Sequence, residues 1–569
     1  MTRPIRIGNA SGFYGDRFDA VREMLTGGPL DVLTGDYLAE LTMLILGRDR
    51  LRDPSLGYAR TFLRQLEGCL GMAAERGVRI VTNAGGLNPA GLADALRSLA
   101  DRLGVPVRVA HVEGDDLRGR AAELGLGEPL TANAYLGAWG IAACLRAGAD
   151  VVVTGRVTDA SLVVGPAAAH FGWTPDDLDA LAGAVVAGHV LECGAQATGG
   201  NFAFFTELDV TRPGFPIAEV HADGSSVITK HPGTGGAVTV DTVTAQLLYE
   251  IAGARYLGPD VTARFDTVGL SEVDTDRVLI SGVRGEPPPA TTKVCLNSLG
   301  GFRNATTFVL CGLDVEAKAA LVRAQLAAAV GPDGLTWTLA RTDHQGAPSE
   351  QEASALLQAT IRTPDAKRAK AFSRAAIELA LASYPGFTVT APPSDGSPYG
   401  VYTAAYVDAK LVDHTAVLPD GTRTPIPPPP LVADAPPPNR ANVTFVSIDA
   451  ADVTFARSGR TREVPIGRVV GARSGDKGGD ANLGVWVRDD RAYPWLVGFL
   501  TVERLAGLLP ETAGLDVSRQ LLPNLRAVNF VIGGLLGEGV AASTRFDPQA
   551  KALGELLRSR PVEVPEELL

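Results

Sequence analysis

Residues 78–112 read VRIVTNAGGLNPAGLADALRSLADRLGVPVRVAHV, and this stretch decides the fold. A short apolar run, Val78–Thr82, precedes a longer segment, Pro89–Leu103, and a second apolar run, Val107–Val112, follows it. Short apolar runs bounded by Gly and polar residues are typical of buried strands, and the longer segment between them predicts a helix. Two strands joined through a helix lie parallel in one sheet, with a right-handed crossover.

The same alternation of strands and helices continues on both sides of this unit. Further strands are expected at Ile5–Gly8, Asp31–Thr34 and Ala149–Thr154, with helices between them. Strands that read as nearly continuous apolar runs are typical of a parallel sheet that is buried on both faces. We therefore predict an α/β fold for the N-terminal region, with a doubly wound, mostly parallel sheet.

The pattern of apolar and turn residues changes after residue 200. Strand-like segments with Gly and Pro turns then mix with isolated helices, which predicts an α+β middle part. Prolines crowd the stretch between Leu418 and Pro438, favour polyproline II and indicate a semi-rigid linker. The predicted organisation is an α/β domain at 1–200, an α+β part at 201–416, a proline-rich linker at 417–440 and a small α+β domain at 441–569.

Glycine-rich polar clusters follow nearly every predicted strand of the first region. In an open parallel sheet, ligands bind outside the carboxyl ends of the strands, so these clusters would share one edge. A single cluster can equally be a turn that caps a helix, but five at one edge favour a binding crevice. The candidate binding residues taken from them are Asn9, Ser11, Asp36, Asn83, Gly85, Gly86 and Arg156.

The cluster that contains Arg156 also contains Asp159. Arginine binds carboxylate or phosphate groups through two parallel hydrogen bonds, and Asp159 is a candidate base. An Arg–Asp pair that only braces the loop is the structural alternative.

A dense polar segment follows at residues 189–201. His189 and Glu192 would share one face of a helix, which resembles part of a metal site, but a second His one turn further is lacking. We take Glu192 as a candidate acid or base and expect no metal. The following turn presents backbone N–H groups suited to an oxyanion or phosphate, and its candidate binding residues are Thr198, Gly199, Gly200 and Asn201. His221, in the β-rich part, is a further candidate for proton transfer, although a structural His in a strand is the alternative.

The C-terminal part contains one dense motif, RSGDKGGDANLG at residues 473–484. A plain hairpin needs only two to five loop residues, and Lys477 is one of few lysines in the chain. We therefore expect Lys477 to be catalytic and the motif to face the strand ends around Asn83 and Arg156; a simple hairpin is the alternative. The candidate binding residues of the motif are Ser474, Asp476, Asp480 and Asn482.

Composition excludes several classes of function. The net charge of −12 and the absence of a long basic cluster argue against a nucleic-acid partner. No segment approaches the ~18 apolar residues of a membrane span, and the five scattered cysteines form neither a disulfide framework nor a CxxC metal site. The GxGxxG, Walker A and GxSxG patterns are also missing. We expect a cytoplasmic homo-oligomer without a membrane partner.

At these motifs the chain resembles the acyclic terpene utilisation protein A (AtuA) family. The resemblance covers nearly the whole chain and rests on Ile7–Asp16, Asn83–Gly86, Thr154–Arg156 with Asp159, Ala197–Asn201, and Ser474–Gly478 with Asp480–Asn482. It implies that the C-terminal domain is ferredoxin-like. The family is named for operons that degrade citronellol and geraniol through acyl-CoA intermediates, and it supplies no agreed catalytic residues.

The leading hypothesis is a cytosolic enzyme that acts on a carboxylated or CoA-thioester acyl substrate, branched or isoprenoid, by hydration, hydrolysis or C–C cleavage. Arg156 and the Gly-rich turns would hold the anionic group, and Asn83 and Asn201 would polarise a carbonyl. The candidate catalytic residues are Asp159, Glu192, His221 and Lys477. No cofactor is expected beyond the CoA moiety of the substrate.

Two other functions remain open from the sequence. One is a non-catalytic protein that binds acyl-CoA or a nucleotide, or that acts as a scaffold. The other is a metal-dependent hydrolase built on His189, Glu192 and an acidic strand end. The density of acid, amide and Arg groups favours an enzyme over a binding protein.

Overall fold

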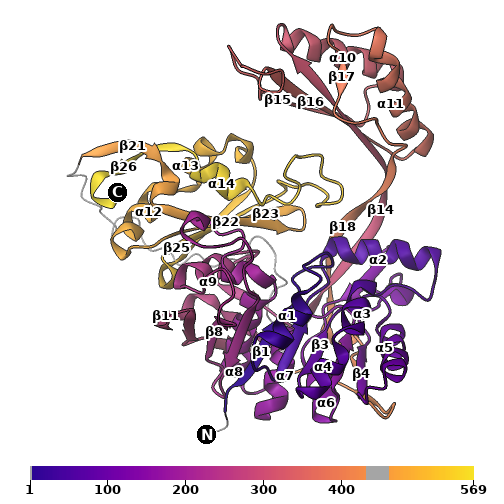
Figure 1. Ribbon diagram of the computed structural model, residues 1–569, viewed down its shortest axis with the longest axis vertical. Helices are drawn as coiled ribbons and strands as arrows, with labels where there is room; N and C mark the ends of the chain where they lie inside the picture. Colours follow the sequence, from indigo (N-terminus) through magenta and orange to yellow (C-terminus); the bar gives the residue numbers. More distant parts are fainter. Residues whose placement is uncertain (1–2, 431–459) are drawn as a thin grey trace. The chain divides into compact units, whose positions relative to one another are not determined.

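The computed structural model describes residues 3–430 and 460–569, which form two compact units (Figure 1). The second unit consists of Ser298–Tyr402 and Glu538–Pro548, and the first contains the other described residues. Two long strands carry the chain from one unit to the other: β14 (Thr291–Cys311) and β18 (Ser397–Asp408). None of the helices in the described residues is both long and apolar enough to cross a membrane.

Five parallel strands form the centre of the large sheet in the first unit. Each pairs with the next in register; Ile7, for example, lies opposite Val32, and Val32 lies opposite Arg79. Their order across the sheet is β1 (Ile5–Asn9), β2 (Val32–Gly35), β3 (Arg79–Thr82), β6 (Val151–Thr154) and β4 (Val109–Glu113). The parallel strands predicted from the apolar runs are therefore present.

Helices cover both faces of these parallel strands. Successive residues of β6 point to opposite faces, so Val151 and Val153 pack into one hydrophobic cluster and Val152 packs into another. The first cluster includes α1 (Ala20–Gly27), α3 (Arg60–Glu67), α4 (Leu70–Glu75) and α5 (Pro89–Leu103). The second includes α6 (Trp139–Arg146), α7 (Ser161–Phe171) and α8 (Leu178–Leu191).

The sheet continues on both sides with antiparallel strands, so as a whole it is mixed. Beyond β1 lie β7 (Pro216–Val220), β8 (Ser226–Lys230), β12 (Arg277–Ser281) and β11 (Gly269–Asp274). Beyond β4 lie β19 (Thr415–Val417) and β20 (Arg423–Pro425). The expectation of a mostly parallel sheet therefore applies to its centre, while the outer strands come from the part predicted as α+β.

The large sheet takes strands from both sides of the predicted domain boundaries. Strands from both sides of residue 200 join one sheet, and Val417–Pro425 of the predicted linker includes an edge strand. Pro425 is tolerated there because an edge strand leaves one side without ladder bonds. Residues 431–440 of the predicted linker and 441–459 of the predicted C-terminal domain lie outside the described residues, and the predicted division into domains stays a prediction.

The C-terminal part of the first unit is a four-stranded antiparallel sheet with helices packed on it. Trp486, Leu522 and Ala527 join the hydrophobic cluster of the main sheet, so the two layers share a core. The strand order is β22 (Val470–Lys477), β23 (Asp480–Val487), β25 (Ala527–Ile532) and β24 (Val517–Leu522). The helices are α12 (Tyr493–Phe499), α13 (Val502–Leu508) and α14 (Leu553–Arg558), and β21 (Thr461–Pro465) pairs with β26 (Pro561–Pro565).

Shorter elements of the first unit lie around the main sheet. The helices are α2 (Glu40–Arg52) and α9 (Val240–Leu247). β5 (Thr131–Ala134) pairs with β14, and a small sheet contains β13 (Arg284–Glu286), β10 (Thr262–Arg264) and β9 (Arg255–Leu257).

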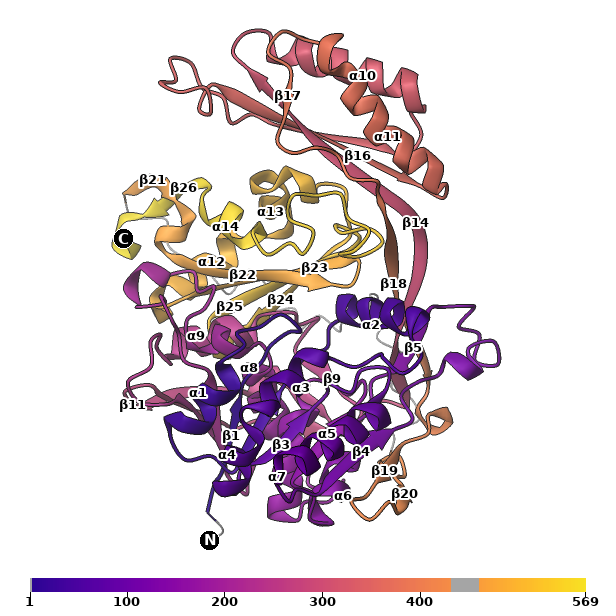
Figure 2. The ribbon, with the colours of Figure 1, turned by 45° about the vertical axis from the view of Figure 1, so that its right-hand side comes forward.

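The second unit has a β-α-β-β-α-β order, which is the ferredoxin-like arrangement. All neighbouring strands are antiparallel, and α10 (Val315–Val330) and α11 (Ala366–Glu378) cover one face of the sheet (Figure 2). The strand order is β15 (Leu335–Ala340), β16 (Ser354–Thr363), β14 and β17 (Thr388–Val389). Phe308, Leu357 and Phe372 form a core that belongs to this unit alone.

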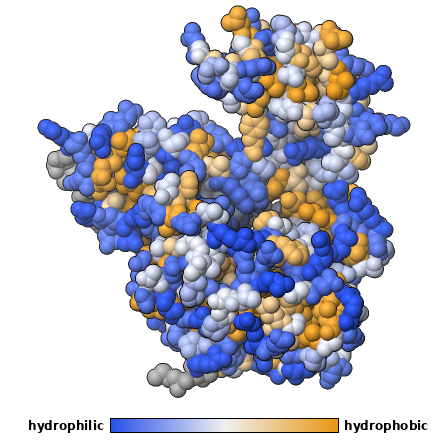
Figure 3. All heavy atoms as spheres, viewed as in Figure 1, coloured by the Kyte–Doolittle hydropathy of each residue, from blue (hydrophilic) through white to orange (hydrophobic). Residues whose placement is uncertain are grey.

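The surface of the molecule shows scattered groups of hydrophobic residues among hydrophilic ones (Figure 3). In the first unit, Leu41 and Ile45 lie one turn apart on α2 and are 41% and 36% exposed. Leu41 directly follows Glu40, the first residue of α2.

Candidate functional site

The carboxyl ends of β1, β2, β3 and β6 lie at one edge of the main sheet, as predicted from their parallel direction. The residues after these strands touch one another. Asn83 Nδ2 donates a hydrogen bond to Asp36 Oδ1 at 2.6 Å, and Asp36 N donates to Ser11 O at 3.0 Å. Three predicted clusters thus form one continuous polar edge.

Arg156 is buried at this edge and makes several contacts. Its Nη1 donates to Asp159 Oδ1 at 2.8 Å and to Leu38 O at 3.0 Å, and its guanidinium lies 4.3 Å from the centre of the Tyr135 ring. The backbone N of Arg156 donates to Asp115 Oδ2 at 2.8 Å. The Arg156–Asp159 pair therefore braces the loop, and it also places the Asp159 carboxylate, 27% exposed, toward the site.

Asp36 lies close to this pair. Burial and the neighbouring Asp159 carboxylate raise the pKa of Asp36 well above its usual range, against the opposing effects of Arg156 and Asn83. The shift of this pKa favours the protonated form of Asp36.

His189 and Glu192 share one face at the end of α8, as predicted. His189 Nδ1 lies 3.1 Å from Glu192 Oε1. Burial, followed by the charge of Lys477, lowers the pKa of His189 to about 4, and burial with the Asp159 and Glu250 carboxyls raises the pKa of Glu192 well above its usual range. The imidazole in this contact is therefore neutral near neutral pH, and the shift of the Glu192 pKa favours the protonated acid.

The hairpin formed by β22 and β23 docks onto the end of α9, and Figures 1 and 2 both show β22 beside that helix. Asn482 fixes the contact: its Oδ1 accepts from Glu250 N at 2.7 Å and its Nδ2 donates to Ile251 O at 3.3 Å. Gly475 allows the close approach, because a Cβ there would lie 2.4 Å from Tyr249 Cε2. The polar motif at 473–484 thus faces the body of the first unit.

Lys477 stands at the tip of this hairpin, at the end of β22. Its Nζ donates to Glu250 O at 2.7 Å. Burial and the neighbouring Lys293 charge lower the pKa of Lys477, while the Glu250, Glu40 and Glu192 carboxyls act in the opposite direction. Because Arg156 and Lys477 both act on the pKa of Glu192, the structure brings the C-terminal motif and the strand ends into one electrostatic cluster.

A second group of charges lies at the start of α2. Glu40 Oε1 accepts a hydrogen bond from Tyr135 Oη at 3.1 Å, and Lys293 Nζ is 3.6 Å from the same oxygen. Although burial opposes ionisation, Lys293 and Arg156 lower the pKa of Glu40 to about 2. Glu40 is therefore ionised at neutral pH.

The pKa of Asp476 shifts upward, in the opposite direction from that of Glu40. Burial, followed by the carboxyls of Glu250 and Glu40, raises its pKa to about 8, and burial also raises the pKa of Glu250. The cluster therefore contains Asp476, protonated at neutral pH, beside the ionised Glu40. Such a separation of protonation states is typical of sites that transfer protons.

Several buried polar atoms of this cluster have no hydrogen-bond partner among the described residues. Native proteins satisfy most buried polar atoms, so such a group requires an explanation, for which a bound ligand or water is suitable. The atoms are Arg156 Nε, Arg473 Nη2, His189 Nε2, Glu192 Oε2 and Gln246 Oε1.

Other predicted binding residues are occupied in holding the loops together. Asn9 Nδ2 donates to Leu191 O at 2.6 Å, Ser11 Oγ donates to Phe13 O at 3.0 Å, and Thr198 Oγ1 donates to Gly214 O at 2.6 Å. Asn83 uses its amide for Asp36 and for Tyr37 N, so it does not present a free group to a substrate carbonyl. Its predicted role is replaced by positioning of Asp36.

The predicted glycines permit close packing around the site. A Cβ on Gly85 would lie 2.4 Å from Thr154 O, and one on Gly86 would lie 2.4 Å from Leu46 Cδ1. In the turn after α8, Gly199 adopts a φ of 106° and Gly200 N donates to Ala195 O at 2.9 Å. Asn201 is exposed, and its carbonyl oxygen accepts from Arg473 Nη1 at 3.3 Å, so its predicted role in polarising a carbonyl finds no support in its position.

In the C-terminal motif, Ser474 and Asp480 also brace the backbone. Ser474 Oγ accepts from Gly554 N at 2.9 Å, and Asp480 Oδ1 accepts from Gly534 N at 2.8 Å. Lys477 and Asp476 are the members of the motif that join the charge cluster.

His221 lies at the opposite edge of the sheet. β7 runs antiparallel to β1, with Ile5 opposite Val220, so the residue after β7 lies at the amino ends of the parallel strands. His221 is therefore separate from the polar cluster at the carboxyl ends, and its catalytic role stays a prediction.

The sequence interpretation missed several groups of the site. Lysines are few in the chain, and that scarcity was a signal for Lys293 as well as for Lys477. Glu40 and Glu250 stand in segments without a recognisable motif, and only the fold brings them to the strand ends. The missed residues are Glu40, Tyr135, Glu250, Lys293 and Arg473.

The described residues contain no group of three or more His, Cys, Asp or Glu side chains arranged to hold a metal ion. His189 and Glu192 therefore have no third such ligand beside them in the described part of the chain. The acids and the cationic side chains of the cluster are the groups that can take part in a reaction there.

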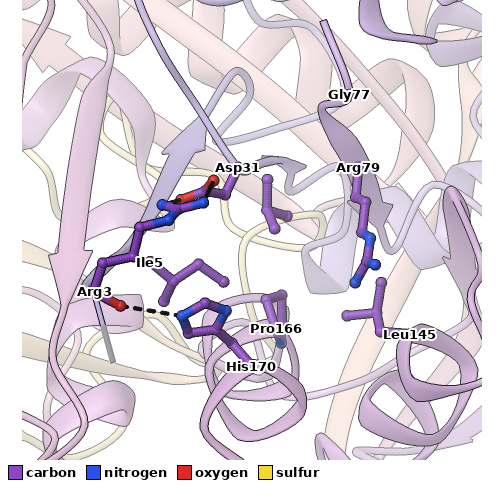
Figure 4. A pocket seen from close by; sticks show the side chains of 9 residues that line it. Arg3, Ile5, Asp31, Gly77, Arg79, Leu145, Pro166 and His170 are labelled. Carbon is purple, nitrogen blue, oxygen red and sulfur yellow. Dashed lines mark hydrogen bonds and ion pairs between the residues drawn. The ribbon is translucent and has the colours of Figure 1, made fainter. Parts of the chain in front are cut away.

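A hollow of about 230 Å³ lies at the amino ends of β1, β2 and β3 (Figure 4). Arg3 and Asp31 form an ion pair of 2.7 Å there, and His170 Nε2 lies 3.1 Å from Arg3 O. Ligands of open α/β sheets bind at the carboxyl ends of the strands, so this hollow does not compete with the cluster around Arg156 and Lys477.

Comparison with known families gives two matches. Residues 5–418 match the model described as acyclic terpene utilisation family protein AtuA, and residues 464–563 match the AtuA ferredoxin-like domain. No curated protein and no solved structure matches the chain.

Proposed function

Because the chain belongs to the acyclic terpene utilisation family AtuA, we propose that its charge cluster binds a branched acyl substrate with an anionic group and transfers protons on it. The substrate is a carboxylate or a CoA thioester, and the reaction is hydration, hydrolysis or C–C cleavage. The observation that carries this proposal is the set of buried, unpartnered polar atoms that gather among the described residues around Arg156, Glu192 and Arg473.

The balance of charge supports an anionic ligand. Arg156, Arg473 and Lys293 bring positive charge to the cluster, whereas burial raises the pKa of Asp36, Glu192, Glu250 and Asp476 and so disfavours their ionised forms. A buried cationic excess is costly unless an anion joins it. The carboxylate of an acid substrate supplies that negative charge, and with a thioester the charge that develops on the carbonyl oxygen during the reaction does so.

The separated protonation states support proton transfer. An acid with a raised pKa donates a proton near neutral pH, and an ionised carboxylate accepts one. In this proposal Glu192 donates the proton and Asp159, which pairs with Arg156 at 2.8 Å, accepts it. Lys477 is the further catalytic group of the site.

The apolar surface at the start of α2 supports a hydrocarbon chain. Leu41 and Ile45 are exposed on α2, and Leu41 directly follows Glu40, whose carboxyl lies in the cluster. Burial of apolar surface contributes about 25 cal/mol per Å², so a branched acyl tail gains affinity by lying along these side chains.

The test uses the purified full-length protein with geranoyl-CoA, 3-methylcrotonoyl-CoA and the free acids, with binding measured by calorimetry and products by mass spectrometry. We expect turnover of an acyl substrate and a loss of ~10²–10⁴ in turnover for Asp159→Asn and for Lys477→Met. Asp101→Asn, an exposed change on α5, is the control and retains full turnover.

Full turnover by both variants would overturn the assignment of these residues. Binding of the acyl-CoA without conversion would favour the non-catalytic alternative instead.

A further inference from the structure

We propose that Lys477 is a nucleophile whose Nζ forms a covalent imine with a ketone or aldehyde carbonyl of the substrate. The proposal rests on the proposed function of the site and narrows its chemistry. Its geometric basis is the place of Lys477 at the tip of a docked hairpin, with Nζ 2.7 Å from Glu250 O and 6.0 Å from the centre of the Tyr256 ring.

The hairpin holds the amine in one position. Lys477 lies opposite Asp480 in the register of β22 and β23, and Gly478 makes the turn with a φ of 67°. Gly479 lies so near the backbone that a Cβ there would be 2.3 Å from Gly537 O. Together with the 2.7 Å hydrogen bond from Nζ to Glu250 O, these contacts restrict the side chain before substrate binds.

The surroundings favour the neutral amine that such chemistry needs. A lysine becomes nucleophilic when burial or another cation lowers its pKa, and both conditions hold here. The titratable and charged groups that act on Lys477 or lie beside it are Lys293, Glu250, Glu40, Glu192, His189 and the Tyr256 ring.

Acids whose pKa is raised, such as Glu192, supply the protons that imine formation requires. The Nζ lone pair adds to the carbonyl carbon, and the C–N bond forms while the carbonyl oxygen takes a proton from an acid such as Glu192. The resulting carbinolamine loses the amine proton to the carboxylate, and the hydroxyl then leaves as water with that proton. The product is a C=N⁺ bond, and no electron donor or acceptor is consumed.

An imine narrows the candidate reactions. The C=N⁺ group accepts the electron pair of a neighbouring C–C bond that breaks, which gives an enamine and releases carbon dioxide or a second carbonyl fragment. Protonation of the enamine carbon and hydrolysis of the imine by water regenerate Lys477. Simple thioester hydrolysis has no use for such a step, so the imine favours C–C cleavage of an oxo-acyl substrate.

Borohydride trapping tests the proposal on the full-length protein, with levulinate (4-oxopentanoate) as the probe because it carries both a ketone and a carboxylate. We expect a stable reduced adduct on Lys477, found by peptide mass spectrometry, that requires both levulinate and borohydride. Lys477→Arg removes it. Exposed Lys367, on α11, is the internal control. An adduct on Lys367 with none on Lys477 would overturn the proposal.

The pH dependence of trapping provides a second measurement that does not need a variant. Trapping at Lys477 should reach its half-maximum at a lower pH than trapping at Lys367, because burial and Lys293 lower the pKa of Lys477. Equal half-maxima would contradict the neutral amine at this site.

These outcomes separate the two proposals. Conversion of an acyl-CoA without trapping at Lys477 would leave the proposed function standing and remove the imine. Trapping at Lys477 with no conversion of the acyl-CoA panel would retain the nucleophile and reject those substrates.

Discussion

Asp115 shows how one residue positions a loop of the site without facing the substrate. Its Oδ2 accepts from Arg156 N and from Asn133 Nδ2, both at 2.8 Å. A Cβ on Gly155 would lie 2.5 Å from its Oδ1, so only glycine fits beside it. Asp115 therefore fixes the turn from which the Arg156 side chain reaches Asp159.

Asp115 also makes stability depend on pH. Burial raises its pKa to about 7, whereas an unfolded Asp titrates near 3.9. The folded state therefore binds the proton more tightly, and the associated stability is full below about pH 4 and is lost as the pH rises through about 7. We expect Asp115→Asn to flatten this decline by an amount on the order of a few kcal/mol.

Denaturant unfolding at pH 5 and at pH 8 measures the difference, with the exposed Asp101→Asn variant as the control. The absolute stability of Asp115→Asn is not the readout, because an amide rearranges the hydrogen bonds. An equal pH dependence in Asp115→Asn and in the native protein would contradict the assignment.

At the scale of elements, the β22–β23 hairpin depends on small residues where it meets the end of α9. A Cβ on Gly484 would lie 2.5 Å from Leu248 Cβ, and one on Gly475 would meet the Tyr249 ring. Larger residues at either position would push the hairpin outward, and Lys477 would move with it.

We expect Gly475→Ala to cost about 1–3 kcal/mol of stability, as overpacking does, and to reduce both turnover and borohydride trapping at Lys477. Gly498→Ala is the matched control, because a Cβ at Gly498 in α12 has nothing within 4 Å and Ala is the better helix former. Thermal unfolding and trapping on the same samples check the result. Native trapping in Gly475→Ala would contradict the role of this contact.

Local sequence patterns predicted some elements better than others. The helix Pro89–Leu103 is found with the predicted bounds, because Asn88 caps it and Gly104 ends it in a left-handed conformation. In contrast, strand β5 at Thr131–Ala134 lies shortly before helix α6, which begins at Trp139. The partner of β5 is Val294–Asn297, far along the chain, and no local pattern reveals such a pairing.

At the scale of the whole molecule, the two units have separate hydrophobic cores. Phe372 packs in the core of the second unit, and Phe530 packs in the C-terminal sheet of the first unit. Units with separate cores can unfold in separate steps.

We expect Phe372→Ala to lower the stability of the second unit by about 3–5 kcal/mol and to leave the first unit unchanged. Calorimetry should then show an early transition, with trapping at Lys477 retained after the second unit has unfolded. Phe530→Ala is the comparison and should shift the other transition. One transition that moves as a whole in both variants would contradict independent cores.

The sequence by itself determined the central parallel strands, the edge at which their polar residues meet, and the family. Buried apolar runs and strand-end motifs are local features, so they can be read without the fold. The predicted homo-oligomer and cytoplasmic location stay predictions.

Only the tertiary structure decided which groups meet at that edge. Glu40, Glu250 and Lys293 come from distant segments, and burial with the neighbouring charges raises the pKa of Asp36 and of Glu192. The local chemistry of His221 suits proton transfer, but the antiparallel direction of β7 carries this residue to the far edge of the sheet. Proximity and desolvation are properties of the folded chain, and no spacing in the sequence records them.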